Sequence, residues 1–188
     1  QAMERLHPGY ERDIQLFVAS DPAKSARLAI DLARICSSGK PVILNVIHDR
    51  EGGTLRHLRE MSVSLADQAT FLRLSPVQRG VKLRLEGPSE AFVMHFETAE
   101  ISVRLVNVLK RLGVGHIHYH HLLGYPPIIA ELPNLIGVTH DFTAHDYYSY
   151  CPQVSLTDHS EKYCGELGIE QCRQCLIRHP APAGESIE

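Results

Sequence analysis

Short apolar runs alternate with longer segments of helical periodicity along most of this chain. The run at residues 41–47, PVILNVI, is β-branched, apolar and short, which is typical of a buried strand. Apolar residues at i, i+3 and i+4 spacing predict helices between the strands. The predicted strands are residues 14–19, 41–47, 69–74, 81–85, 91–96, 116–121 and 135–138, and the predicted helices are residues 21–36, 55–65, 100–112 and 128–132. This alternation predicts an α/β fold with a mostly parallel sheet flanked by helices.

The last predicted strand ends in side chains that can donate, accept or carry a proton. Residues 135–138 are apolar, and Thr139, His140 and Asp141 follow them directly. Ligands of open α/β sheets bind outside the carboxyl ends of the parallel strands. We therefore expect His140 and Asp141 to lie in a cleft for a sugar-containing ligand. The alternative is a strand that simply ends in a solvated loop.

A glycine pair follows the most strand-like run. Gly52 and Gly53 lie between the strand at 41–47 and the helix predicted at 55–65. In a strand–turn–helix unit, backbone N–H groups and the helix N-terminus can face a phosphate, and glycine has no Cβ to block close approach. The pair is thus a phosphate-binding hypothesis, and its alternative is an ordinary turn.

Histidines are unusually frequent, and several crowd into one predicted strand. Side chains at i, i+2 and i+4 share a face of a strand, so His116, His118 and His120 would line one side. Three such histidines can bind a transition metal. Helices cover both faces of a parallel strand, however, and leave its carboxyl end open. We therefore favour the interpretation that His120 and His121 reach the cleft.

Four cysteines gather near the end of the chain. Cys172 and Cys175 form a C-x2-C pair that can present two thiolates to one metal ion. Together with Cys151 and Cys164 they would complete a closed tetrahedral zinc site, and the alternatives are oxidised pairs or free thiols. In each case the segment is a structural staple, because four thiolates leave no open metal position.

Composition narrows the classes of function. The chain has 188 residues, of which 44% are hydrophobic, so it is long and apolar enough for one globular domain. Nineteen basic and 22 acidic residues give a net charge of −3, which argues against a nucleic-acid partner. No apolar run reaches the ~18 residues of a membrane span, and the first residues lack the apolar core of a signal peptide. We expect a cytoplasmic location.

Three segments together resemble one enzyme family. Residues 42–57 resemble the first strand and glycine loop of GT4-type retaining glycosyltransferases, and residues 118–124 resemble their fourth strand and the following loop. Residues 138–142 resemble the strand tip that bears the family's active-site histidine. A subgroup continues into a Cys-Pro and a cysteine-rich insert, as Cys151-Pro152 and the later cysteines do here. The match covers residues 41–176 in the family's order.

The resemblance implies one half of a GT-B fold. Residues 41–150 would form its N-terminal, acceptor-side domain, a Rossmann-like three-layer sandwich. Residues 1–40 would be a strand–helix extension, residues 151–178 the Cys-rich C-terminal insert and residues 179–188 a tail. The family's second domain holds the nucleotide-sugar through a paired-glutamate motif, and no such motif is present in this sequence. We expect a fragment that is inactive without that C-terminal donor domain.

The resemblance also implies roles for particular residues. The reaction would be a hexosyltransferase-type transfer from a nucleotide-sugar to a carbohydrate or lipid-linked acceptor, with retention at the anomeric carbon. His140 matches the histidine that contacts the donor sugar, and Asp141 would orient it or touch the acceptor. The glycine pair would bind the donor phosphates, and His120 and His121 would bind acceptor hydroxyls. No cofactor is required for catalysis, a structural zinc ion is the one metal expected, and a lipid-linked acceptor implies peripheral membrane contact.

Two other classes of function stay open. One is a non-catalytic, Rossmann-like module that binds a carbohydrate or a protein partner and carries a structural zinc site. The other is a metal-dependent regulator built on the cysteine and histidine clusters. The donor nucleotide, the sugar, the acceptor and the oligomeric state do not follow from the sequence.

Overall fold

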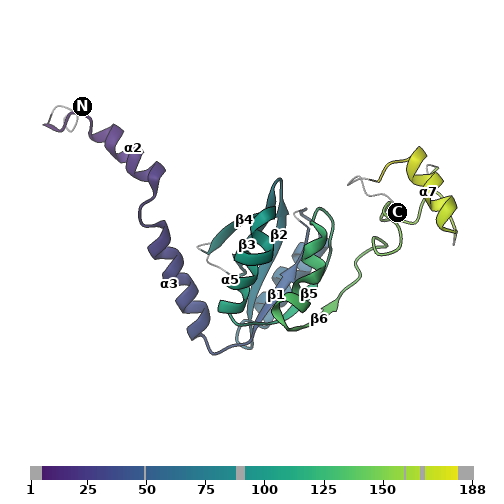
Figure 1. Ribbon diagram of the computed structural model, residues 1–188, viewed down its shortest axis with the longest axis horizontal. Helices are drawn as coiled ribbons and strands as arrows, with labels where there is room; N and C mark the ends of the chain where they lie inside the picture. The colour runs from purple at the N-terminus through teal and green to yellow at the C-terminus, as the bar shows by residue number, and fades with distance from the viewer. Residues whose placement is uncertain (1–5, 49, 88–91, 159, 166–167, 182–188) are drawn as a thin grey trace. The chain divides into compact units, whose positions relative to one another are not determined.

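The computed structural model describes residues 6–48, 50–87, 92–158, 160–165 and 168–181 (Figure 1). The chain divides into two compact units, residues 1–39 and residues 40–188. No helix in the described ranges has both the length and the apolarity that a membrane crossing requires.

The first unit contains the helices α2 (Tyr10–Ser20) and α3 (Lys24–Ser37). The strand predicted at residues 14–19 is therefore wrong. A helix satisfies its own backbone hydrogen bonds, whereas a lone strand needs a partner, and Glu11 and Asp13 favour the N-terminus of α2 by their charge. The helix predicted at residues 21–36 is confirmed as α3, with its start shifted to Lys24.

The second unit is built on one sheet. In the described part of the chain it has six strands in the order β4-β3-β2-β1-β5-β6. The strands are β1 (Val42–Val46), β2 (Thr70–Val77), β3 (Gly80–Leu85), β4 (Val93–Glu97), β5 (Val114–Tyr119) and β6 (Thr139–Phe142). β1 pairs in parallel with β2 and β5, and β5 pairs in parallel with β6, whereas β2–β3 and β3–β4 are antiparallel. The predicted α/β class with a mostly parallel, helix-flanked sheet is confirmed.

Helices lie against both faces of this sheet. Leu55 and Leu58 of α4 (Gly53–Ser64) pack on Ile47, just beyond β1. On the other face, Tyr119 of β5 donates a hydrogen bond to the carbonyl of Ile129 in η3 (Pro127–Glu131), at 2.8 Å. Figure 1 shows α5 (Val106–Arg111) in front of the strands; it follows the short turns η1 (Thr98–Glu100) and η2 (Ile101–Leu105).

The core lies where β1, β2 and β5 meet these helices. Its fully buried side chains share an aliphatic or aromatic character, and none is exposed by more than 1% of its surface: Leu44, Val46, Leu58, Leu72, Leu74, Leu83, Phe96, Ile101, Leu109 and Ile117. The predicted strands at 41–47, 69–74, 81–85 and 91–96 are thus confirmed within a few residues, although residue 91 lies outside the described ranges.

The strand predicted at residues 135–138 is wrong. Residues 132–136 form the short helix α6 (Leu132–Ile136), in which Pro133 occupies the first turn. Gly137 ends the helix in the left-handed region (φ 84°) and donates its N–H to the carbonyl of Pro133. The strand begins only at Thr139, so His140 and Asp141 lie within the exposed edge strand β6 and not beyond a buried one.

The remaining elements complete the second unit. The helix predicted at 100–112 is split into η2 and α5, and the helix predicted at 128–132 is divided between η3 and α6. The last helix, α7 (Ile169–Arg178), follows the irregular segment that carries Cys151 and Cys164.

Candidate functional site

The carboxyl ends of β1 and β5 lie side by side and bring histidines together. The backbone N–H groups of His120 and His121 both donate to the carbonyl of Val46, at 2.8 and 3.2 Å. These bonds continue the parallel pairing past the last strand residues. His48, two residues after Val46, therefore lies beside His121, with ring centroids 5.1 Å apart.

Two other parts of the chain add histidines to this edge. The His57 ring, from α4, lies 5.9 Å from the rings of both His120 and His145. The rings of His120 and His145 are stacked, with centroids 5.3 Å apart. We call His48, His57, His120, His121, His145 and Asp146 the carboxyl-end cluster.

Hydrogen bonds define the tautomer of the buried His120. Asn45 donates its amide N–H to the carbonyl of Leu72, so its Oδ1 is the atom that faces His120 Nε2, at 3.2 Å. Nε2 must therefore carry the proton, and Nδ1 accepts from His145 Nε2 at 3.0 Å. The result is a directed chain of hydrogen bonds from His145 through His120 to the strand β1.

Burial keeps His120 of this cluster uncharged at neutral pH. Burial, together with the neighbouring histidines His118, His145 and His57, lowers the pKa of His120 to about 3. Burial is also the main cause that lowers the pKa values of His48 and His145. Neutral imidazoles both donate and accept hydrogen bonds, which suits ligands rich in hydroxyl groups.

His121 forms a second, carboxylate-linked branch. Its Nδ1 accepts from the backbone N–H of Leu123 at 2.9 Å, so Nε2 carries the proton and donates to Asp146 Oδ2 at 3.1 Å. The other oxygen of Asp146 accepts the backbone N–H of Tyr148 at 2.9 Å. The Tyr148 ring lies 4.5 Å from the His121 ring. The imidazole and the carboxylate are therefore held in one orientation.

The predicted glycine turn lies next to this cluster. Gly52 is the N-cap of α4 with φ 153°, a conformation that L side chains rarely adopt, and Gly53 is the first residue of the helix. A Cβ at either position would meet no atom within 4 Å, so the space in front of the helix start is open. Gly52 lies four residues after His48 in the sequence, and His57 lies about one turn after Gly53 along the same helix.

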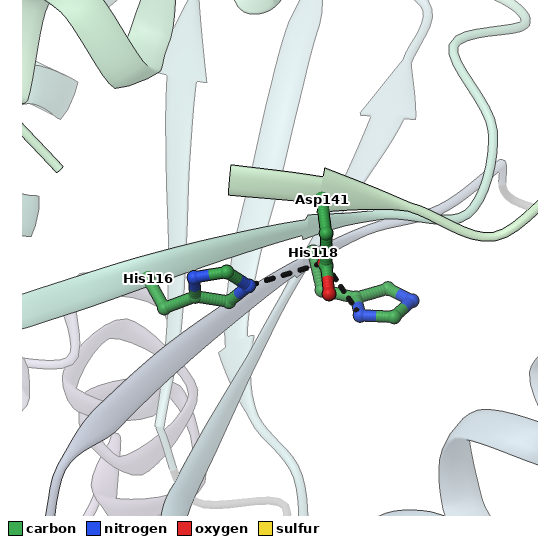
Figure 2. Close-up of side chains that lie close together, drawn as sticks. All are labelled: His116, His118 and Asp141. Carbon is green, nitrogen blue, oxygen red and sulfur yellow. Dashed lines mark ion pairs between the residues drawn. The ribbon is translucent and has the colours of Figure 1, made fainter. Parts of the chain in front are cut away.

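His140 and Asp141 point to opposite faces of the sheet. His140 is in register with Ile117, and Asp141 with His118. Successive side chains alternate between faces, and the His140 ring lies 6.1 Å from the Tyr119 ring on the η3 side. Asp141 contacts His116 and His118 on the other side (Figure 2). The structure therefore does not bring the two predicted catalytic side chains into one arrangement.

The structure groups two of the three histidines of β5 with a carboxylate. In the described part of the chain, the nitrogens of His116 and His118 and a carboxylate oxygen of Asp141 all lie within 4.8 Å of one another, as ligands of one metal ion would. His120, the third histidine of the predicted row, instead faces Asn45 and His145.

Sequence reasoning missed several members of the cluster. His57 was not singled out, and His145 and Asp146 lie in a segment without periodicity. One signal was available. The dipeptide His-Asp occurs at 48–49, 140–141 and 145–146, and the last pair is the one that contacts His120 and His121.

The four late cysteines are not joined by disulfide bonds in the structure. Cys151 and Cys164 lie in irregular segments, and Cys172 and Cys175 lie three residues apart on one face of α7. Burial raises the pKa of the Cys175 thiol, and Cys151, Cys164 and Cys172 raise it further, so these three thiols lie within electrostatic range of Cys175. The predicted structural zinc site stays a prediction.

Comparison of the chain with protein-family models, with curated proteins and with solved structures finds no match.

Proposed function

We propose that this chain is the acceptor-side, Rossmann-like domain of a GT-B retaining glycosyltransferase of the GT4 type. Its partner in catalysis would be a donor domain that binds the nucleotide-sugar. The proposal rests on the sequence resemblance of residues 41–176 and on the organisation of the carboxyl-end cluster. In this proposal, the mostly parallel sheet is the middle layer of a three-layer sandwich, between two layers of helices.

The main structural support is the convergence of separate chain segments. The end of β1, the first turns of α4, the end of β5 and the segment after β6 all contribute side chains to the carboxyl-end cluster. This is the edge at which open α/β sheets bind their ligands. The helix start at Gly52 and Gly53 adds open backbone donors beside it.

The chemistry of the cluster suits a sugar hydroxyl better than a charged ligand. His120 and His121 have neutral or carboxylate-paired imidazoles, and Tyr148 offers an aromatic ring beside them. In the proposed enzyme these groups would orient the acceptor hydroxyl, and the glycine turn would stabilise the charge that develops on the leaving diphosphate. Closure of the donor domain would exclude water, which otherwise competes as acceptor.

Two His-Asp pairs are available for the role of the family's histidine. The resemblance assigns His140, with Asp141 as its orienting partner, although these side chains lie on opposite faces of β6. His145 and Asp146 instead contact the acceptor-side histidines directly. The His145 pair is the better positioned of the two for chemistry at the carboxyl-end cluster.

The proposal is tested by sugar transfer in a protein that contains this chain together with its donor domain. His145→Ala should lower kcat/KM by on the order of 100-fold, because a positioned imidazole contributes about that much to proton transfer. His95→Ala, at an exposed histidine of β4, is the matched control and should leave transfer unchanged. Unchanged kcat/KM in both His145→Ala and His140→Ala would end the assignment.

A non-catalytic carbohydrate-binding module is the second candidate. It is favoured by the observation that the whole cluster is assembled within residues 40–188, so a ligand could be bound without a second domain. Saccharide binding that shifts the imidazole resonances of His120 and His145, with no transfer by any form of the protein, would support this candidate over the enzyme.

A further inference from the structure

We propose that His116, His118 and Asp141 bind one divalent first-row transition-metal ion, of the class of Zn²⁺ or Co²⁺. This inference does not depend on the proposed glycosyltransferase. It rests on the geometry of two strands, β5 and the edge strand β6, which place the three side chains on one face of the sheet (Figure 2).

The separations between ligand atoms fit a common metal ion. Asp141 Oδ1 lies 3.1 Å from His116 Nε2 and 2.9 Å from His118 Nδ1. With metal–ligand bonds of about 2.1 Å, ligands at right angles lie about 3.0 Å apart and tetrahedral ligands about 3.4 Å apart. The two separations from Asp141 therefore fit one ion, and the third, between the two imidazole nitrogens, is within 4.8 Å.

The second nitrogen of each imidazole is already held by a threonine. His116 Nδ1 lies 2.9 Å from Thr139 Oγ1, and His118 Nε2 lies 2.9 Å from Thr143 Oγ1. When a metal ion binds, each hydroxyl can accept the ring N–H, which leaves the nitrogen that faces Asp141 unprotonated and able to bind the ion. Such outer contacts are typical of metal-binding histidines, because they set the tautomer and the orientation of the ring.

The surroundings leave room for further ligands of the ion. β6 is an edge strand, and the Asp141 side chain is 58% exposed while those of His116 and His118 are 31% and 18% exposed. Two imidazoles and one carboxylate occupy three positions of a four- or six-coordinate ion. The others are open to water or to a ligand from solution.

Cobalt(II) is the probe for the test, because its absorption reports the ligand type. The full chain would be titrated with Co²⁺ after Cys151, Cys164, Cys172 and Cys175 are replaced by serine, so that thiolates do not compete. We expect one Co²⁺ per chain without thiolate charge-transfer absorption. Asp141→Asn, which keeps the shape but weakens the ligand, should lower the affinity at least 100-fold, and Thr139→Val about tenfold.

The matched control is His140→Ala, one residue away on the opposite face of β6, which should leave the affinity within twofold. A second measurement uses the chain with its cysteines intact. There, Co²⁺ should broaden the imidazole resonances of His116 and His118 and spare that of His95, and this result decides the question if the serine variant does not fold. Absence of broadening at both histidines, or an affinity that Asp141→Asn leaves unchanged, would overturn the proposal.

Discussion

Polar side chains are paired differently on the two sides of the central strand β1. On the β2–β3–β4 side, Arg73 Nε and a Glu86 oxygen form an ion pair at 2.7 Å, and both side chains are less than 10% exposed. On the β5–β6 side, histidines and carboxylates meet at or near the open strand ends. Antiparallel hairpins return the chain on itself and close such pairs inside the fold. Parallel strands need crossovers, and their ends therefore collect residues from distant parts of the chain.

The largest effect on stability is expected on the β2–β3–β4 side, at the buried Arg73–Glu86 ion pair. Glu86→Ala leaves the buried Arg73 guanidinium without its carboxylate, and breaking one half of a buried ion pair costs about 3–5 kcal/mol. Urea denaturation would measure this loss in the free energy of unfolding. Glu60→Ala, which breaks the exposed pair with Arg56, is the control and should change stability far less. Equal losses in the two variants would remove the distinction between the two sides.

A smaller loss of stability is expected at the hydrogen bond that joins His120 to Asn45 of β1. Asn45→Leu removes the acceptor of His120 Nε2 and the donor to the carbonyl of Leu72. An unsatisfied buried polar group costs about 1–3 kcal/mol. The same denaturation experiment would measure it, together with the imidazole resonances of His120, which should lose their fixed tautomer. A fully stable variant would show that the hydrogen bond does not hold the cluster to β1.

Acid should destabilise the folded chain through His120, on the β5–β6 side. The pKa of His120 is about 3 in the folded chain and about 6.5 when unfolded, so the folded state binds fewer protons between these values. Its contribution to stability is complete above pH 6.5 and is lost by about 1.4 kcal/mol per pH unit as the pH falls from 6.5 toward 3. The more exposed His48 and His145 shift in the same direction and add less. Urea denaturation at pH 7, 6 and 5 with a chelator present would test this, and a flat profile would contradict it.

The smallest effect on stability is expected at the metal-binding triad. Asp141 is more than half exposed, so Asp141→Asn should change the urea midpoint of the metal-free chain little while abolishing tight Co²⁺ binding. This separation of binding from stability would sharpen the contrast with Glu86. A large loss of stability in Asp141→Asn would instead show that Asp141 has a structural role like that of Glu86.

Much of the sheet could be predicted from local sequence, and the wrong predictions have physical causes. Residues 41–47 were predictable because a β-branched apolar run fits a central strand buried on both faces. The apolar run at 14–19 looks the same locally, yet it lies in the helix α2, and the described residues of the first unit contain no strand with which it could pair. At residues 135–138, Pro133 and Gly137 mark a short helix and its end, and these signals outweigh the apolar pattern.

The site was predictable only where it follows strand order. His120 and His121 were identified because a strand end leads directly to them, and the glycine turn because it precedes a helix. His145 contacts His120 across 25 residues of sequence, and no periodicity marks it. The strand predicted at residues 135–138 begins only at Thr139, so His140 and Asp141 lie inside β6, where successive side chains point to opposite faces of the sheet.

His118 is one of the three proposed metal ligands and also contacts the carboxyl-end cluster. Its ring centroid lies 4.3 Å from that of His120, and its Nδ1 lies 2.9 Å from Asp141. Two ligands that share one side chain obey thermodynamic reciprocity: the factor by which an ion at Asp141 changes the affinity of a saccharide near His120 is the factor by which the saccharide changes the affinity of the ion. Because the His118 imidazole lies between the two sites, we expect binding at one site to change the affinity at the other. Titration of one ligand in the presence of the other would measure this coupling.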